Sequence, residues 1–310
     1  MNIIDTATTR AALRFDRLIP ALKTLFIAGC EVPLRHTHTL TAPNGDASTL
    51  LLMPAWQSGG FLGIKTVTIT PGNAARRLPG LFSTYVLYDA TTGEPLAQMD
   101  GNEITSRRTA AASALAASYL APVHARTLLV VGSGRVARLL PEAYRCVRPI
   151  DRVLVWSRTP ASAQALAASL RADGFDAEAA PSLAHAASMA DVVSCATLAT
   201  EPIVRGEWLA AHNHLDLIGS FTPQMREADD ACFADALLVV DTPEALLKSG
   251  ELLSPMSRGV FHADSVAGTL EGLTRGVTVG RQPSTGRTVF KSVGTALEDL
   301  AAATLVFQSR

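Results

Sequence analysis

The chain has 310 residues, of which 48% are hydrophobic and 18% are charged, and its formal net charge at pH 7 is -1. A chain of this length can bury two hydrophobic cores, so we expect two domains. Because neither sign of charge is in excess, the composition argues against a nucleic-acid-binding protein.

The N-terminal sequence MNIIDTATTRAALRFDRL mixes charged and apolar side chains and lacks the apolar stretch of a signal peptide. No apolar run approaches the roughly 20 residues that a membrane-spanning helix needs. The four cysteines, Cys30, Cys146, Cys195 and Cys232, are scattered singly and read as buried thiols in a reducing compartment. We therefore expect a cytoplasmic protein that is neither secreted nor inserted in a membrane.

The first hundred residues predict strands in TLLLMPAW, GIKTVTIT and STYVLYDA, separated by turn signals such as PGN and TTGEP. This pattern indicates a separate α+β domain. The last stretch, VFKSVGTALEDLAAATLVFQ, has apolar residues at helical spacing and predicts a helix that returns to this domain.

From about residue 130, short β-rich runs alternate with helical stretches, as in TLLVVG, RVARLLPEAYRC, RVLVWS and ASAQALAASLRADG. The alternation continues through DVVSCAT, HLDLIG and ALLVVDT. Such βαβ alternation predicts an α/β fold with a Rossmann-type, doubly wound parallel sheet. We place this domain at residues 116–292 and the α+β domain at residues 1–115 with 293–310.

The segment VVGSGRVA places two glycines, Gly132 and Gly134, between a predicted strand and a predicted helix. The first glycine permits a tight turn, the second lets the backbone approach a pyrophosphate, and the small Ala137 allows close helix packing. A helix N-terminus also favours phosphate. We expect this loop to bind a dinucleotide through Gly132, Ser133, Gly134, Arg135, Val136 and Ala137.

The strand that follows ends in VLVWSRT, where an NAD-selective protein usually carries an acidic residue. Here Ser157, Arg158 and Thr159 offer a guanidinium and two hydroxyls, which suit a 2′-phosphate. We therefore favour NADP(H). A solvated Arg158 in an ordinary loop is the alternative, and it would leave NAD(H) possible.

Eight segments together point to a known family: GIKTVTITPGN, LYDATTGEPLAQMDGNEITSRRTAAASALA, VVGSGRVA, WSRT, TLATEPIVRGEW, MREADD, VVDT and TVFKSVGTALEDLAAATLV. Through these segments the chain resembles the ornithine cyclodeaminase/mu-crystallin family over most of its length. Three of these motifs, MDGNEITSRRTAA, TLATEPI and TVFKS, are closer to the mu-crystallin branch than to the cyclodeaminases.

The resemblance implies a homodimer whose N-terminal domain, completed by the C-terminal helix, supplies the interface and binds substrate. The implied ligand is an amino acid or a cyclic imine whose carboxylate is held by Arg35, Lys65 and Arg108, with Lys65 and Arg108 as catalytic residues. Ser292 and Gly294 match a segment that approaches nicotinamide and substrate, and Thr197 and Leu198 are assigned to the cofactor.

Taken without the family, a lone basic residue is usually solvated. Lys65 has a stronger claim to a site because it lies between Ile64 and the strand TVTIT. Arg108 is expected to open an alanine-rich helix just before the nucleotide domain. A cluster of such cations would fix an anionic substrate and orient its reactive carbon.

The sequence departs from the cyclodeaminases after the strand HLDLIG. The resemblance places an acidic residue of cyclodeaminases where this chain has Phe221, which cannot accept or relay a proton. A reductase needs no such acid, because a protonated imine accepts hydride directly. We expect Phe221 to form an apolar wall for substrate, although an ordinary core aromatic would fit equally.

Two remaining patterns are given structural interpretations. Glu227 and Asp229 match the RExD pattern of the family and are expected to hold a hydrogen-bond network. The pairs His36/His38 and His212/His214 lack a third ligand at metal spacing, so we expect no metal site.

These observations favour an NADPH-dependent reductase of cyclic ketimine carboxylates, Δ1-pyrroline-2-carboxylate or Δ1-piperideine-2-carboxylate. An ornithine cyclodeaminase that uses NAD is the second hypothesis, and an amino-acid dehydrogenase such as an alanine dehydrogenase is the third. A non-catalytic protein that binds NADPH or a small ligand is the rival from another class, since one fold hosts several functions.

Overall fold

The computed structural model describes residues 1–42 and 47–309, which form two compact units. Unit 1 comprises Met1–Arg108 and Thr295–Arg310, and unit 2 comprises Thr109–Gly294. The first division falls inside one continuous helix, α3 (Gly101–Leu120), so no turn or linker marks where unit 1 ends.

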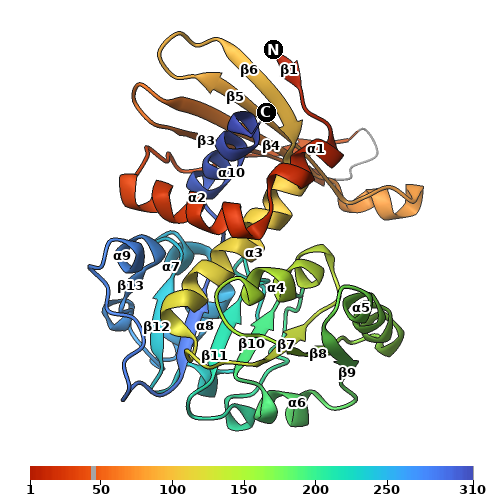
Figure 1. Ribbon diagram of the computed structural model, residues 1–310, viewed down its shortest axis with the longest axis vertical. Helices are drawn as coiled ribbons and strands as arrows, with labels where there is room; N and C mark the ends of the chain where they lie inside the picture. The colour runs from red at the N-terminus through yellow and green to blue at the C-terminus, as the bar shows by residue number, and fades with distance from the viewer. Residues whose placement is uncertain (43–46, 310) are drawn as a thin grey trace. The chain divides into compact units, whose positions relative to one another are not determined.

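Unit 1 is built from one sheet and a few helices (Figure 1). Its elements are β1 (Asn2–Ile3), α1 (Thr6–Ala12), α2 (Phe15–Ala28), β2 (His36–Thr41), β3 (Ala47–Trp56), β4 (Phe61–Ile69), the 3-10 helix η1 (Pro71–Arg76), β5 (Leu81–Asp89), β6 (Pro95–Asp100), the start of α3 and α10 (Ala296–Gln308). The strands follow the order β1-β6-β5-β4-β3-β2, antiparallel except for the β1–β6 pair.

Helix α10 covers one face of this sheet and contacts β3, β4 and β5 as well as α2 (Figure 1). Along β4 the buried side chains alternate, which is the period-2 pattern of a half-buried strand. Thr295 caps α10 by accepting a hydrogen bond from the backbone of Leu297. The cap and the positive helix N-terminus favour the two carboxylates of the first turn, Glu298 and Asp299.

Unit 2 alternates strands and helices, which confirms the predicted α/β fold. Its elements are the rest of α3, β7 (Thr127–Val131), α4 (Arg135–Arg145), β8 (Arg152–Trp156), α5 (Pro160–Ala172), β9 (Asp176–Ala179), α6 (Leu183–Met189), β10 (Val192–Cys195), η2 (Gly206–Trp208), β11 (His214–Leu217), η3 (Asp230–Cys232), β12 (Leu237–Val240), α7 (Ala245–Lys248), α8 (Gly250–Ser257), η4 (Ala263–Ser265), β13 (Gly268–Thr269), α9 (Leu270–Thr274) and β14 (Thr288–Lys291).

The sheet of unit 2 has the strand order β13-β12-β14-β11-β10-β7-β8-β9, and all its pairings are parallel. The chain runs outward from β7 through β8 to β9 and then returns to the other side of β7 with β10 (Figure 1). Ligands of open α/β sheets bind beyond the carboxyl ends of the strands at such a switch point. The loops after β7 and β10 are therefore the first place to look for a site.

The structure corrects three expectations from the sequence. The segment TVFK forms β14 at the centre of the parallel sheet, so the last stretch is a strand followed by a helix. Arg108 does not open its helix: α3 begins at Gly101, because Asp100 accepts hydrogen bonds from the backbone of Asn102 and Glu103. Of the four cysteines expected to be buried, Cys146 is exposed and Cys30 is half-buried, whereas Cys195 and Cys232 are buried. Among the described residues, no helix is long and apolar enough to cross a membrane.

Candidate functional site

The glycine loop between β7 and α4 is held by contacts that require glycine at its first position. Gly132 has φ 121, which L side chains rarely adopt, and its N–H donates to the carbonyl of Trp156 at 2.8 Å. A Cβ atom at this position would lie 2.7 Å from the carbonyl oxygen of Ala196. Gly132 therefore holds the glycine loop against the segment that follows β10.

Gly134 precedes α4, and unlike at Gly132 no contact within the protein requires a glycine there. Its φ of -77 suits any residue, and an added Cβ would meet no protein atom within 4 Å. The fold itself therefore gives no reason for glycine here. An open cradle at a helix N-terminus fits the close approach of a phosphate to the backbone.

These two glycines give a paired prediction. Gly134→Ala is expected to keep its thermal stability and to weaken dinucleotide binding about tenfold, because the new methyl group occupies the phosphate approach. Gly132→Ala is expected to lose about 1–3 kcal/mol of unfolding free energy through backbone strain. Thermal melts and titration with NADPH fluorescence measure both effects. Unchanged affinity in Gly134→Ala would contradict the cradle.

The residues expected to choose the cofactor lie together at the end of β8. Ser157 Oγ lies 3.2 Å from Ser133 Oγ of the glycine loop. Arg158 and Thr159 follow on the exposed turn before α5. Within the part of the chain that the structure describes, no hydrogen bond or ion pair ties down the guanidinium of Arg158. A cation and hydroxyls beside the glycine loop suit a phosphate.

The other predicted residues of the loop take different positions. Arg135 is the first residue of α4 and is exposed, Val136 is half-buried, and Ala137 is fully buried. The buried Ala137 accords with close packing of helix on strand. At the end of β10, Leu198 is 77% exposed, which leaves its side chain accessible to a ligand.

Thr197, beside Leu198, is fixed by a buried carboxylate. The backbone N–H and the hydroxyl of Thr197 both donate to Glu227 Oε1 at 2.7 Å, and the N–H of Gly219 donates to Glu227 Oε2 at 2.6 Å. Asp229 accepts from the backbone of Gly206 at 2.9 Å. The structure thus shows the hydrogen-bond network expected for Glu227 and Asp229.

Ser292 and Gly294 lie just after β14. The N–H of Ser292 donates to the carbonyl of Leu217, and the N–H of Gly294 donates to Asp241 Oδ2 at 2.6 Å. Gly294 has φ 78, a conformation that favours glycine. A buried Asp241 therefore holds the backbone of this segment, a contact between distant residues that no local pattern predicts.

Phe221 lies in the loop after β11 with 43% of its surface exposed. It is therefore not an ordinary core aromatic, which removes the alternative left open by the sequence. An exposed phenylalanine at the carboxyl end of a parallel strand is available to contact a ligand.

Lys65, in unit 1, is buried and paired with a carboxylate. It lies on β4 with 2% of its surface exposed, and its Nζ is 2.6 Å from Asp299 Oδ2 of α10. Burial lowers the pKa of Lys65 to about 8, although Asp299 opposes the shift, and the charges of Arg108 and Arg35 add to it. These three cations are therefore electrostatically coupled, and Lys65 can exchange a proton near neutral pH.

Arg108 binds the same helix. Its Nε donates to Asp299 Oδ1 at 2.9 Å and its Nη1 donates to Glu298 Oε2 at 2.6 Å. Asp299 thus joins Lys65 to Arg108. The carboxylates therefore orient both cations.

Both carboxylates of α10 and the residues that pack beside Lys65 were not predicted from the sequence. Tyr85 lies opposite Lys65 in the β4–β5 pairing and is fully buried. A Cβ at Gly63 would lie 1.8 Å from the Tyr85 hydroxyl, so the strand keeps a glycine there to admit the phenol. The acidic pair in ALEDL was the one available signal, since carboxylates in a buried first turn need cationic partners.

The two histidine pairs lie on or directly before the strands β2 and β11. His36 and His38 alternate along β2, and His214 is buried on β11 with Nδ1 2.8 Å from Thr288 Oγ1. Burial lowers the pKa of His214 to about 3. Among the described residues, no three histidine, cysteine or acidic side chains group closely enough to hold a metal ion.

Comparison with known proteins gives a consistent result. Residues 12–310 match the sequence profile of the ornithine cyclodeaminase/mu-crystallin family. Delta(1)-pyrroline-2-carboxylate reductase of Paracoccus denitrificans is 42% identical over 284 residues, covering 88% of this chain and 89% of its own. Ketimine reductase mu-crystallin of Rattus norvegicus is 37% identical over 262 residues, covering 83% and 79% of the two chains.

Two solved structures share the whole fold. Delta(1)-pyrroline-2-carboxylate reductase of Thermococcus litoralis, in complex with NADH and L-proline, superimposes with a TM-score of 0.92 at 30% identity and covers 99% of this chain and 97% of its own. An archaeal alanine dehydrogenase dimer with bound NAD gives a TM-score of 0.90 at 29% identity, with 99% and 95% covered.

Proposed function

The chain belongs to the ornithine cyclodeaminase/mu-crystallin family as one of its NAD(P)-dependent reductases, and we propose that it uses NADPH to reduce cyclic ketimine carboxylates. The proposed substrates are Δ1-pyrroline-2-carboxylate and Δ1-piperideine-2-carboxylate, and the products are proline and pipecolate. The observation that carries the substrate class is the buried pair of cations, Lys65 and Arg108, joined by Asp299. Both cations are oriented before a ligand arrives.

The cations would bind the carboxylate of the imine. A carboxylate accepts several hydrogen bonds, and charge-assisted bonds to Lys65 and Arg108 fix its orientation as well as its position. The charge of Arg35 contributes to the lowered pKa of Lys65, and Arg35 would be the third cation that binds the carboxylate. The side chains of Lys65 and Arg108 are almost fully shielded from water, so charges interact more strongly there than at the surface, and Glu298 and Asp299 already offset part of the attraction of these cations for a further anion.

Reduction of an imine also needs a proton on the ring nitrogen. Lys65 has a pKa of about 8, so it is mostly protonated at pH 7 and can still release its proton. We assign Lys65 to hold this proton while Arg108 keeps the carboxylate in place. When bound, the reduced nicotinamide supplies the hydride that the imine carbon receives.

Phe221 favours reduction over cyclodeamination. Its apolar side chain cannot take a proton from an amino group, and its exposure leaves it available to wall the substrate. An ornithine cyclodeaminase would need another base in this position. Two alternatives remain, an alanine dehydrogenase and a non-catalytic NADPH-binding protein. An activity assay distinguishes them from the reductase.

The preference for NADPH rests on Arg158 with Ser157 and Thr159. Relatives of this fold have been solved with NADH and NAD, so the choice of dinucleotide is part of the proposal. Arg158→Ala is expected to weaken NADPH binding about 10–100-fold and leave NADH binding within about twofold, because only NADPH carries the 2′-phosphate.

The control for this measurement is Arg152→Ala. Arg152 is the first residue of β8, at the other end of this strand from Arg158, and pairs with the exposed Glu178 at 2.7 Å. Its removal should change neither affinity. Equal losses for NADPH and NADH in Arg158→Ala would place Arg158 outside the 2′-phosphate site.

The function itself is tested by following NADPH absorbance with Δ1-pyrroline-2-carboxylate as substrate. Imine-dependent loss of NADPH, with no ammonia from ornithine and NAD, is the expected result. Ammonia release from ornithine without net cofactor consumption would establish the cyclodeaminase. Loss of NADH that depends on pyruvate and ammonium would identify a dehydrogenase, and NADPH binding without any turnover would identify a binding protein.

We also propose that the protein is a cytoplasmic homodimer. A solved relative is described as a dimer, and unit 1 exposes large apolar side chains that a second copy would cover. These side chains are Leu34, Leu40, Leu81 and Phe82. Sedimentation of the purified protein at twice the chain mass of 32.6 kDa is the expected result.

A further inference from the structure

The loop 219–228, which carries Phe221, is closed by its own side chains. The N–H of Gly219 at its start donates to the carboxylate of Glu227 near its end, at 2.6 Å. A Cβ at Gly219 would lie 2.4 Å from Glu227 Oε1, so this approach requires glycine. The loop therefore has a fixed base from which Phe221 projects.

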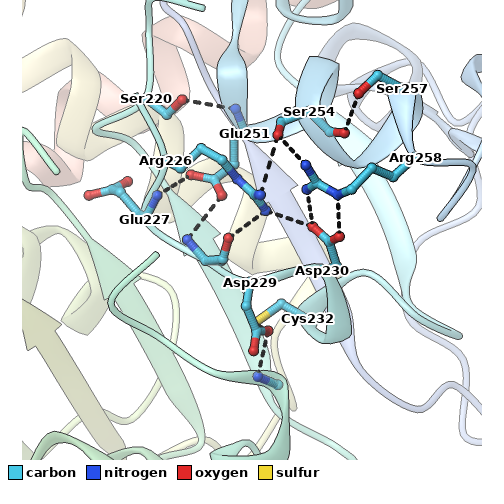
Figure 2. A network of polar contacts seen from close by, with 12 residues as sticks. Ser220, Arg226, Glu227, Asp229, Asp230, Cys232, Glu251, Ser254, Ser257 and Arg258 are labelled. Carbon is cyan, nitrogen blue, oxygen red and sulfur yellow. Dashed lines mark hydrogen bonds and ion pairs between the residues drawn. The ribbon is translucent and has the colours of Figure 1, made fainter. Parts of the chain in front are cut away.

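Glu251 in α8 contacts both ends of this loop (Figure 2). Its Oε2 accepts from the N–H of Glu227 at 2.7 Å and its Oε1 accepts from the N–H of Ala228 at 3.0 Å. Its own backbone N–H donates to Ser220 Oγ at 3.1 Å. One buried residue of a neighbouring helix thus holds the start and the end of the loop together.

The contacts continue from Glu251 to the segment after β10. Glu227, whose backbone Glu251 binds, uses its own carboxylate to bind the N–H and hydroxyl of Thr197. The residue before Thr197, Ala196, packs against the glycine loop at Gly132. A continuous path of hydrogen bonds and packing therefore runs from α8 to the dinucleotide loop.

A gain in folding stability does not explain this network, because burying carboxylates costs free energy. Glu227 and Glu251 are two fully buried carboxylates, and the charge of the buried Lys291 is shared between them and other acids. Burial raises the pKa of Glu251 to about 7 despite Lys291. Apolar side chains at such positions often give an equally or more stable core. The network is therefore better explained by what it positions.

We propose that Glu251 is a positioning residue for catalysis: it fixes the loop 219–228 and, through Glu227, the segment at Thr197. Phe221 and Thr197 are then presented to substrate and cofactor in a single geometry. The inference rests on the proposed function, because that function supplies the substrate and the cofactor that Phe221 and Thr197 would contact. It assigns a role to Glu251, which contacts neither substrate nor cofactor and acts by holding the backbone of Glu227 and Ala228.

The test is Glu251→Gln, which keeps the shape and removes one acceptor. A glutamine offers one oxygen to two N–H donors, so either Glu227 or Ala228 loses its partner. We expect kcat with Δ1-pyrroline-2-carboxylate to fall about 10–100-fold, because small misplacements of this kind have such effects. The Kd for NADPH, measured by its fluorescence, should rise about tenfold.

The matched control is Arg258→Gln, in the same network (Figure 2). Arg258 follows α8 and binds Asp230 and Ser254, which also bind Arg226 of the loop 219–228; these contacts of Arg226 remain when Arg258 is replaced. It should melt at a lower temperature with kcat and the NADPH Kd unchanged within about twofold. A general loss of stability would affect both variants alike, whereas positioning affects Glu251→Gln alone.

Both variants are assayed well below their melting temperatures. A folded Glu251→Gln with wild-type kcat and Kd overturns the proposal, as does an equal kinetic loss in Arg258→Gln. If Glu251→Gln does not fold, Ser220→Ala decides, because it removes the hydroxyl that accepts from the Glu251 N–H, together with the contacts of that hydroxyl to Met225 and Ser249. Unchanged kinetics in Ser220→Ala overturn the proposal. If the wild-type protein reduces no imine, the proposed function fails, and the NADPH Kd still tests Glu251.

Discussion

Lys65→Met is expected to lower kcat/KM for Δ1-pyrroline-2-carboxylate by about 10²–10³-fold, while the protein stays folded. Methionine fills the same space but offers neither a charge to the substrate carboxylate nor a proton to the ring nitrogen. Asp299 keeps Arg108 as a partner at 2.9 Å, so no carboxylate is left entirely unpaired. Steady-state kinetics with a thermal melt of the same sample measure both parts of the result.

The pH profile provides an independent check on Lys65. In the proposed mechanism its charged form binds the carboxylate and carries the proton, and its pKa is about 8, so kcat/KM should fall as the pH rises through that value. Lys65→Arg keeps the charge and should lose this decline, because a guanidinium stays protonated at higher pH. A wild-type profile that is flat between pH 7 and 9 would contradict the assignment of Lys65 as proton holder.

The parallel sheet and the glycine loop could be predicted from the sequence because each depends on local patterns. Alternation of β-rich and helical runs predicts βαβ units, and the spacing of Gly132 and Gly134 predicts the tight turn between β7 and α4. The strand β14 was missed for a physical reason. Its four residues precede a turn and a long helix, so the apolar pattern of TVF merges with that of α10.

The partners of the buried charges could not be predicted from local patterns. Lys65 and Asp299 are far apart in sequence, and only the packing of α10 on β4 brings their side chains together. Glu251 likewise acts on backbone groups of a distant loop, and a lone glutamate in GELLSP carries no sign of that contact. The family resemblance thus pointed to the cations, whereas the carboxylates that pair with them could be found only in the fold.

Arg108→Ala has the second large effect, and it acts on stability as well as on rate. The change leaves Glu298 and Asp299 buried in the first turn of α10, with only Lys65 to offset them. Breaking a buried ion pair from one side costs about 3–5 kcal/mol, so the unfolding transition of the variant should move to a much lower denaturant concentration.

The kinetic consequence is measured at a temperature where Arg108→Ala is still folded. KM for the imine should rise and kcat should fall, with about 10³-fold lost in kcat/KM, because the guanidinium both binds the carboxylate and aligns the reacting carbon. Arg108→Lys serves as the control: it restores the charge, and with it most of the stability, but not the two-pronged geometry. If Arg108→Ala loses stability yet keeps its kinetic constants, Arg108 belongs to the packing of α10 alone, and the carboxylate must be held by Lys65 and Arg35.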